Sequence, residues 1–217
     1  MIGDKPRVID EPITLRKFGD YADPEVLFPH AFQWNLSAGR PYYHWLCGGP
    51  EIAERTIAMW MRQPSSEISI QRTQFVEYGS AIAAGFILIG GAELKKARSA
   101  DVESLWTILD VPSRGDLIER LSQSQRLFAP VEEDECYGSK MGVTKSFRGK
   151  GLAQPMLDCW FEQGNALGYC KFRLDVHADN KHALRWYFAN GFEIVYTGQT
   201  TDGALTYHAM RHERKIK

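Results

Sequence analysis

Apolar and polar residues alternate in several short stretches of the chain, most clearly between Cys170 and Val176. A period of two is typical of strands that bury one face. The Gly79–Ser80 pair separates two such stretches and favours a tight hairpin turn between them. The pattern predicts strands over residues 12–18, 67–78, 81–91, 136–144, 170–176, 192–197 and 204–211.

Other stretches repeat apolar residues at every third or fourth position, which is the period of a helix with one buried face. Residues 23–37 share this period, but Pro29 predicts that the helix is broken there or begins later. The pattern predicts further helices over residues 51–62, 101–109, 116–127, 152–168 and 180–191.

The most specific chemistry lies in one turn between a strand and a helix. A strand end at Val143 is followed by the turn Arg148-Gly149-Lys150-Gly151, and the next helix opens at Leu152. Helix starts present unpaired N–H groups and a positive dipole end, and both attract anions. The two glycines let an anion approach the main chain, and the two basic side chains add positive charge. We therefore predict a pyrophosphate-binding turn.

Two common phosphate loops do not fit this turn. A Walker loop requires Ser or Thr after its lysine, whereas Gly151 follows Lys150. A dinucleotide-binding fingerprint requires a third small residue, and Gln154 stands at that position. Nucleotide binding of either of these kinds is therefore not predicted.

Two spaced motifs resemble those of one enzyme superfamily. Arg148-x-x-Gly151-x-Ala153 resembles the cofactor signature of the GNAT superfamily of acetyl-CoA-dependent N-acetyltransferases. Asn180-x-x-Ala183-x-x-x-Tyr187-x-x-x-Gly191-Phe192 resembles the second block of that superfamily, at the expected distance. The resemblance covers residues 137–197. Ala153 stands where glycine is more common, but the position requires only a small residue.

The resemblance implies an α+β fold with α/β/α layers, in which helices flank a central mixed, mostly antiparallel sheet with two splayed parallel strands. The length and the 44% apolar content predict a single domain over residues 1–217. Residues from about 93 to 134 exceed the family pattern, and their two predicted helices suggest a helical insertion on the open edge of the sheet. This insertion would be a substrate lid, a homodimer contact or a cover for the core.

The resemblance also implies a site for acetyl-CoA as co-substrate, with no metal. Main-chain groups of Met141 and Val143 would hold the pantetheine arm and the acetyl carbonyl. Asn180 would contact the same arm, or would only cap its helix. The pyrophosphate would lie on the turn made by Arg148, Gly149, Lys150, Gly151, Leu152 and Ala153.

Acetyl transfer to an amine needs an acid and a base. Tyr187 is the candidate acid, because a phenol keeps its proton at neutral pH and can give it to the departing thiolate. The alternative is that Tyr187 is a core residue of an amphipathic helix. Among the acids before the strand that leads to Val143, Glu135 is the candidate base, and His177 is its rival.

Composition limits the partners. A net charge of −1 argues against general nucleic-acid binding, and no apolar run is long enough to span a membrane. The start of the chain lacks the pattern of a signal peptide, and the four cysteines show no metal spacing, so we expect a cytoplasmic protein with free thiols.

Charge is distributed unevenly. Residues 101–135 hold nine acids and three bases, whereas residues 136–217 hold twelve bases and seven acids. This division suits a polyanionic cofactor beside a cationic acceptor, and a solvated surface explains it equally well.

The expected function is acetylation of a primary amine on a small molecule or peptide. The alternatives are an acetyl-CoA-binding module without turnover, or transfer of another acyl group.

Overall fold

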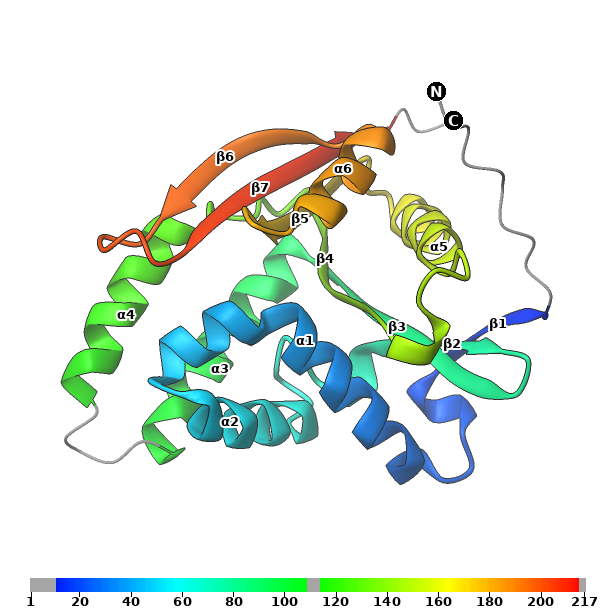
Figure 1. Cartoon of the computed structure of the whole chain (residues 1–217), viewed down its shortest axis with the longest axis horizontal. Coiled ribbons are helices and arrows are strands. Elements are labelled where there is room, and N and C mark those ends of the chain that lie inside the picture. The colour runs from blue at the N-terminus through cyan, green and yellow to red at the C-terminus, as the bar shows by residue number, and fades with distance from the viewer. Residues whose placement is uncertain (1–10, 109–113, 215–217) are drawn as a thin grey trace.

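A computed structural model describes residues 11–108 and 114–214 (Figure 1). Its strands are β1 (Ile13–Lys17), β2 (Thr73–Tyr78), β3 (Ala81–Gly90), β4 (Glu135–Val143), β5 (Lys171–His177), β6 (Glu193–Gln199) and β7 (Thr206–Glu213). Its α-helices are α1 (Phe28–Cys47), α2 (Pro50–Arg62), α3 (Gly91–Ile108), α4 (Arg114–Leu127), α5 (Ala153–Ala166) and α6 (Lys181–Ala189). Short 3₁₀ turns are η1 (Phe18–Asp20), η2 (Pro24–Leu27), η3 (Ile70–Arg72) and η4 (Lys145–Phe147).

The seven strands form one sheet in the order β1-β2-β3-β4-β5-β7-β6. Every neighbouring pair is antiparallel except β4 and β5, which are parallel. α1 and α2 cover one face of the sheet, and α5 covers the other (Figure 1). The apolar side chains of these helices pack against the sheet. The layered, mixed and mostly antiparallel architecture expected from the sequence is confirmed.

The two parallel strands separate soon after they meet. β4 pairs with β5 only from Glu135 to Tyr137, whereas β5 stays paired with β7 along its whole length. β4 continues along β3 as far as Val143, with a register shift that leaves Ser139 as an extra residue. The separation opens the sheet between β4 and β5, as the resemblance implied.

The first long helix differs in extent from the sequence pattern. Residues 24–27 form η2, and α1 begins at Phe28 immediately before Pro29, a position where proline is tolerated. The helix then runs past residue 37 to Cys47, although Pro41 lies inside it. The buried side chains of Tyr43 and Leu46 continue its apolar face, which explains why the helix persists.

The predicted strand over residues 67–78 is wrong in its first half. Only β2 is extended, and residues 67–72 form a turn that ends in η3. Polar side chains replace the strand partners there. Ser66 Oγ accepts the N–H of Ile68 (3.1 Å), and an Asp101 carboxylate oxygen accepts the N–H of Glu67 (3.0 Å). Such local bonds compete with a sheet ladder.

The segment beyond the family pattern consists of α3 and α4. α3 begins at Gly91, ten residues before the predicted helix start, and a Cβ there would lie 1.9 Å from the carbonyl oxygen of Glu132. α3 packs against α2, β3 and β4, whereas α4 contacts α1 and the edge strand β6. The buried apolar side chains of the two helices are Leu94, Ala97, Leu105, Leu117 and Leu127. These contacts favour a cover for the core. The predicted turn at residues 112–115 begins outside the described residues.

Candidate functional site

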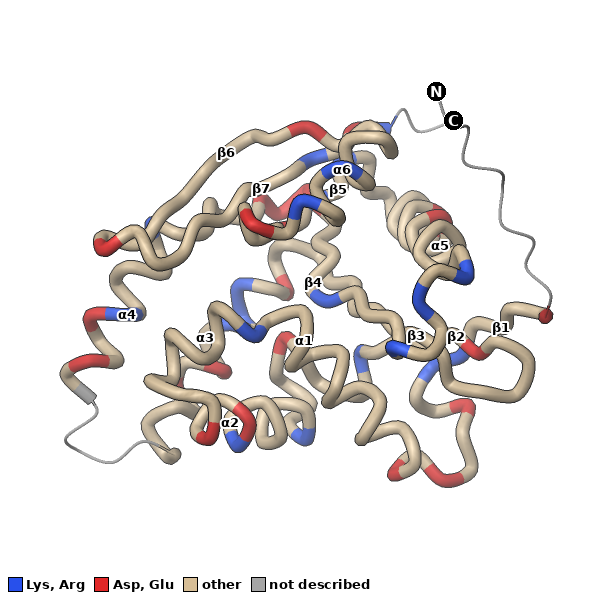
Figure 2. Tube along the Cα trace, in the orientation of Figure 1, with Lys and Arg blue, Asp and Glu red and all other residues tan. Residues whose placement is uncertain are grey.

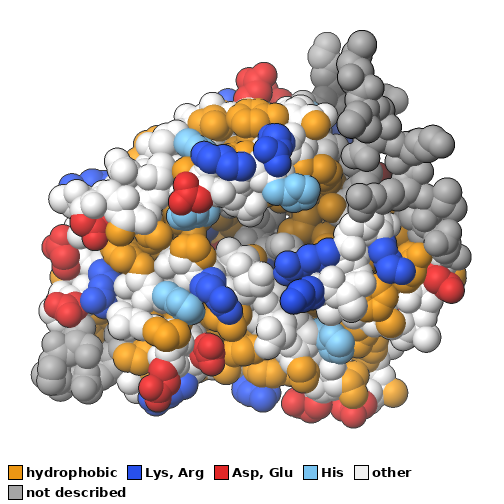
Figure 3. All heavy atoms as spheres, viewed as in Figure 1, with side chains coloured by type: hydrophobic (Ala, Val, Ile, Leu, Met, Phe, Trp, Pro, Cys, Tyr) orange, Lys and Arg blue, Asp and Glu red, His pale blue; other side chains and the backbone are white. Residues whose placement is uncertain are grey.

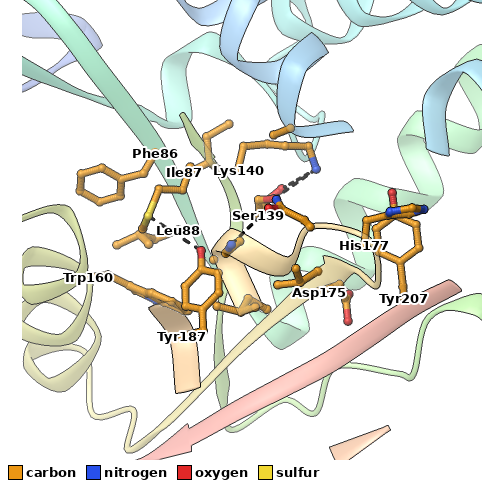
Figure 4. Close-up of a pocket in the computed structure, with 17 residues that line it drawn as sticks. Phe86, Ile87, Leu88, Ser139, Lys140, Trp160, Asp175, His177, Tyr187 and Tyr207 are labelled. Carbon is orange, nitrogen blue, oxygen red and sulfur yellow. Dashed lines mark hydrogen bonds between the residues drawn. The ribbon is translucent and has the colours of Figure 1, made fainter. Parts of the chain in front are cut away.

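The opening between β4 and β5 holds a cavity of about 160 Å³ (Figure 4). Residues of β3, β4, β5, β7, α1, α5, the loop before α6 and α6 line it. Figure 3 shows that this face of the molecule is hollowed between α1 and α6, and that Lys and Arg side chains gather beside the hollow. None of the described residues of α3 and α4 lines the cavity, so the structure does not favour the interpretation of these helices as a substrate lid.

The cavity has an apolar half and a polar half because side chains alternate along β5. Leu174 and Val176 point into the core formed with α5, together with Trp160. Asp175 lies on the other face of the sheet, where Tyr137 Oη donates to its carboxylate (2.9 Å). Figure 4 shows Trp160, Leu88 and Tyr187 on one side and Lys140, His177 and Tyr207 on the other.

The predicted phosphate turn lies between η4 and α5. Gly149 and Gly151 have φ values of 80° and 83°, which disfavour other residues, and a Cβ at Gly151 would meet no atom within 4 Å. Leu152 is buried and fixes the start of α5, and Ala153 is the first residue of that helix. The turn therefore presents an open main-chain surface at a helix start, as a pyrophosphate site requires.

The two basic side chains of this turn are exposed. Arg148 Nε donates to the carbonyl oxygen of Val143 (3.2 Å), which ties the turn to the end of β4. Lys150 Nζ lies 4.9 Å from the centre of the Tyr78 ring. Figure 2 shows Lys and Arg residues in the loop that precedes α5. Their charge is thus held beside the glycines.

Tyr187 points from α6 into the cavity. Its hydroxyl donates to Met141 Sδ on β4 (3.9 Å), and its ring stacks edge-on against Phe192 with centroids 5.3 Å apart. Burial raises the pKa of the Tyr187 phenol to about 12, so it keeps its proton at neutral pH. The side chain therefore packs in the core and also presents a protonated hydroxyl at the opening between β4 and β5.

Asn180 lines the same cavity and caps α6. Its Oδ1 accepts the N–H of Ala183 (3.1 Å), as expected for an N-cap. The cap uses only the amide oxygen, so it does not occupy the amide nitrogen.

The structure does not bring Glu135 to Tyr187. Glu135 begins β4 where β4 and β5 are still paired, and it is only 2% exposed. One carboxylate oxygen accepts the N–H of Glu132 (2.9 Å), and the other lies 4.0 Å from Arg211. These contacts close the turn before the strand. His177, the alternative candidate base, lines the cavity.

Sequence reasoning missed three charged residues near the polar half. Asp175 and Lys140 line the cavity, and Glu67 reaches β4 from the turn before β2. Asp175 also accepts from Arg173 Nη1 (2.8 Å). Alternation along β5 could have placed Asp175 opposite the core. The sequence contains no signal that brings Glu67 to a strand about seventy residues away.

Glu67 is charged despite its burial. Burial alone would raise its pKa, but Arg98, Lys140 and a hydrogen bond from Ser139 lower it to about 2. Arg98 Nε lies 2.8 Å from one carboxylate oxygen, and Lys140 Nζ lies 3.7 Å from the other. The polar half of the cavity is therefore backed by a fixed ion cluster.

Asp101 on α3 should give a characteristic pH dependence of stability. Burial raises its pKa to about 7, compared with about 3.9 in an unfolded chain. The folded state thus binds the extra proton, and the free energy of unfolding should fall as the pH rises from about 4 to 7. Asp101→Asn keeps an acceptor for the Glu67 N–H and removes this loss. We expect the melting temperature of Asp101→Asn, measured relative to wild type at each pH, to increase as the pH is raised across that range. Asp116→Asn, at an exposed site, should show no such trend.

Comparison with known proteins identifies the family. The model of the acetyltransferase (GNAT) family matches residues 83–192, which is just over half of the chain. The match spans most of β3, all of β4, the phosphate turn and Tyr187. The chain belongs to the GNAT acetyltransferase family. This assignment confirms the resemblance drawn from the two motifs.

Solved GNAT structures share the fold at low sequence identity. An N-acetyltransferase from Staphylococcus aureus Mu50 is 20% identical with a TM-score of 0.64, and the alignment covers 92% of this chain and 100% of that one. Another acetyltransferase is 21% identical with a TM-score of 0.60, covering 93% and 100%. A Bacillus subtilis acetyltransferase in complex with CoA is 10% identical with a TM-score of 0.52, covering 95% and 100%. No curated protein sequence matches the chain.

Within residues 11–108 and 114–214, no group of three or more His, Cys, Asp or Glu residues could hold a metal ion. No helix in the described part of the chain is long and apolar enough to cross a membrane.

Proposed function

We propose that this GNAT protein transfers an acetyl group from acetyl-CoA directly to the amine of a small molecule or peptide, with Tyr187 as general acid. One observation carries the proposal. The cavity in the opening between β4 and β5 has a protonated phenol on its apolar side and a carboxylate, Asp175, on its polar side. Thiolate departure and amine attack need groups of these two kinds.

The residues present fit CoA as the carrier of the acyl group. The pyrophosphate would occupy the open space at Gly151, where Arg148 and Lys150 supply positive charge. Met141 and Val143 on the separated part of β4 would hold the pantetheine arm through the main chain, and Asn180 would contact it from the start of α6. Bound acetyl-CoA supplies the thioester.

The amine would enter from the polar half. An alkylammonium must lose a proton before it attacks the thioester carbonyl. Asp175 is the only carboxylate among the described residues that line the cavity. Each of its oxygens accepts one bond, from Arg173 or Tyr137, and a carboxylate oxygen can accept two. Asp175 therefore replaces Glu135 in our proposal as the group that binds the ammonium and receives its proton.

The leaving group would be served by Tyr187. When the carbon–sulfur bond breaks, the sulfur would take the phenolic proton. The phenolate would regain a proton from the attacking nitrogen, which must lose one to become an amide. The phenol is protonated at neutral pH and therefore has a proton to give, but the same burial makes it a weaker acid than an exposed tyrosine. The four cysteines are free thiols, which supports our expectation of a reducing, cytoplasmic setting.

The direct test is acetyl-CoA turnover with a panel of amines. We expect release of free thiol that depends on the added amine, together with an acetylated product of matching mass. Acetyl-CoA binding without turnover on any amine would support the binding-module alternative. Faster turnover with a longer acyl-CoA would replace the acetyl group in the proposal.

A further inference from the structure

Lys140 is a cation placed in the polar half of the cavity. It lies on β4 immediately after the bulged residue Ser139, and its side chain is only 15% exposed. Its Nζ lies 3.7 Å from a Glu67 oxygen, 3.2 Å from the carbonyl oxygen of Ser139 and 5.4 Å from the ring centre of Tyr43. Figure 4 shows the side chain of Lys140 near Ser139 and on the His177 side of the cavity.

Glu67, the carboxylate beside Lys140, also has a second cationic partner and so does not neutralise Lys140 by itself. Glu67 is already paired with Arg98 Nε (2.8 Å) and accepts a bond from Ser139 Oγ. Two cations therefore share one carboxylate. Asp175 pairs with Arg173 at 2.8 Å, and no ion pair joins it to Lys140 among the described residues. Asp101 is partly neutral near pH 7, because burial raises its pKa to about 7. The polar half thus has an excess of positive charge.

His177 contributes a second donor to the same half. Its Nδ1 accepts the N–H of Asp179 (3.3 Å), so Nε2 carries the proton of the neutral ring. The ring is held edge-on against Tyr207, with centroids 5.1 Å apart. A buried cation and an N–H donor that line one small cavity are suited to a carboxylate.

We infer that the acceptor is an amine that also carries a carboxylate, as an amino acid does, and that this carboxylate binds at Lys140 and His177. The inference rests on the proposed acetyl transfer and names the substrate class for it. Asp175 then receives the ammonium end, and the amine faces the opening where Tyr187 lies. A polyamine would place a second cation against Lys140, so the structure disfavours it.

The first experiment compares acceptors that differ only in the carboxylate. Amino acids of varied side chain are assayed against their amides and against the amines that lack the carboxyl group. We expect kcat/KM for the best amino acid to exceed that of its neutral partners at least about 10-fold, mainly through a lower KM. Equal or better turnover of the neutral partners would overturn the inference and leave acetyl transfer standing.

Substitutions assign the effect to Lys140. Lys140→Met keeps the aliphatic stem, and Glu67 retains Arg98 and Ser139, so the fold should persist. The ratio of kcat/KM for acid over amide should fall to about 1 in this variant and be kept in Lys140→Arg. Lys96→Met, which removes an exposed lysine of α3, should keep the ratio as well. A preference retained in folded Lys140→Met would refute the assignment.

Binding measurements distinguish the proposed carboxylate site from the proposed acetyl transfer. Calorimetry with free amino acids, in the presence of CoA, reports the carboxylate site without any turnover. If no amine is acetylated but amino acids bind wild type at least about 10-fold more tightly than Lys140→Met, the proposed function fails and the site remains. If amines are acetylated but no carboxylate binds better than its amide, the site fails and the function remains.

Discussion

Gly151→Val should reduce acetyl-CoA affinity at least about 100-fold while the protein remains folded. The glycine has a φ of 83°, and a Cβ there would enter space that holds no protein atom within 4 Å. We assign that space to the pyrophosphate, so a branched side chain would exclude the cofactor and would also strain the turn. Calorimetric titration with acetyl-CoA measures the loss, and circular dichroism and thermal melting check the fold.

Gly168→Val is the matched control for this prediction. Gly168 lies just beyond the other end of α5, has a φ of 87°, and a Cβ there would likewise meet no atom within 4 Å. The substitution therefore imposes similar backbone strain away from the phosphate turn. Gly168→Val should bind acetyl-CoA as wild type does. Equal losses in both variants would indicate a strain effect. Unchanged affinity in folded Gly151→Val would show that the phosphate turn does not hold the pyrophosphate.

The strands and most helices follow from local pattern because one face of each element is buried. β5 shows the alternation directly, since Phe172, Leu174 and Val176 enter the apolar core with α5. Arg173 and Asp175 alternate with them and are buried as an ion pair on the opposite face. The pattern failed at residues 67–72, where hydrogen bonds to Ser66 and Asp101 replace a strand partner. It also missed the extension of α1 beyond residue 37, because tertiary burial of Tyr43 outweighs the effect of Pro41.

The two halves of the candidate site differ in how far sequence reveals them. The phosphate turn and Tyr187 lie within one continuous stretch, so two motifs with fixed spacing suffice to predict them, although β3 also contributes Leu88 to the apolar half. The polar half combines Glu67, Lys140 and Asp175 from three separate segments. Their meeting depends on the bulge at Ser139 and on the separation of β4 from β5. Glu135 is close to Val143 in the sequence, but sequence distance does not reveal which carboxylate the fold brings into the cavity.

Tyr187→Phe should lower kcat by about 100-fold or more with little change in acetyl-CoA affinity. The phenylalanine ring keeps the edge-on contact with Phe192, and only the bond to Met141 Sδ and the transferable proton are lost. Because burial holds the pKa of Tyr187 at about 12, the phenol stays protonated, and it should cause no fall in rate with rising pH below about pH 10. Steady-state kinetics over a pH series, with calorimetry for the cofactor, test both statements.

Tyr42→Phe is the matched control for the loss of a buried phenol. Tyr42 on α1 donates to Ser124 Oγ (3.2 Å), and burial raises its pKa to about 12 as well, but it does not line the cavity. Removing its hydroxyl should cost stability of about 1 kcal/mol and leave kcat near the wild-type value. If Tyr187→Phe also turned over at the wild-type rate, Tyr187 would be a packing residue. The thiolate would then leave without a proton from this side chain, and the cavity would keep only its binding role.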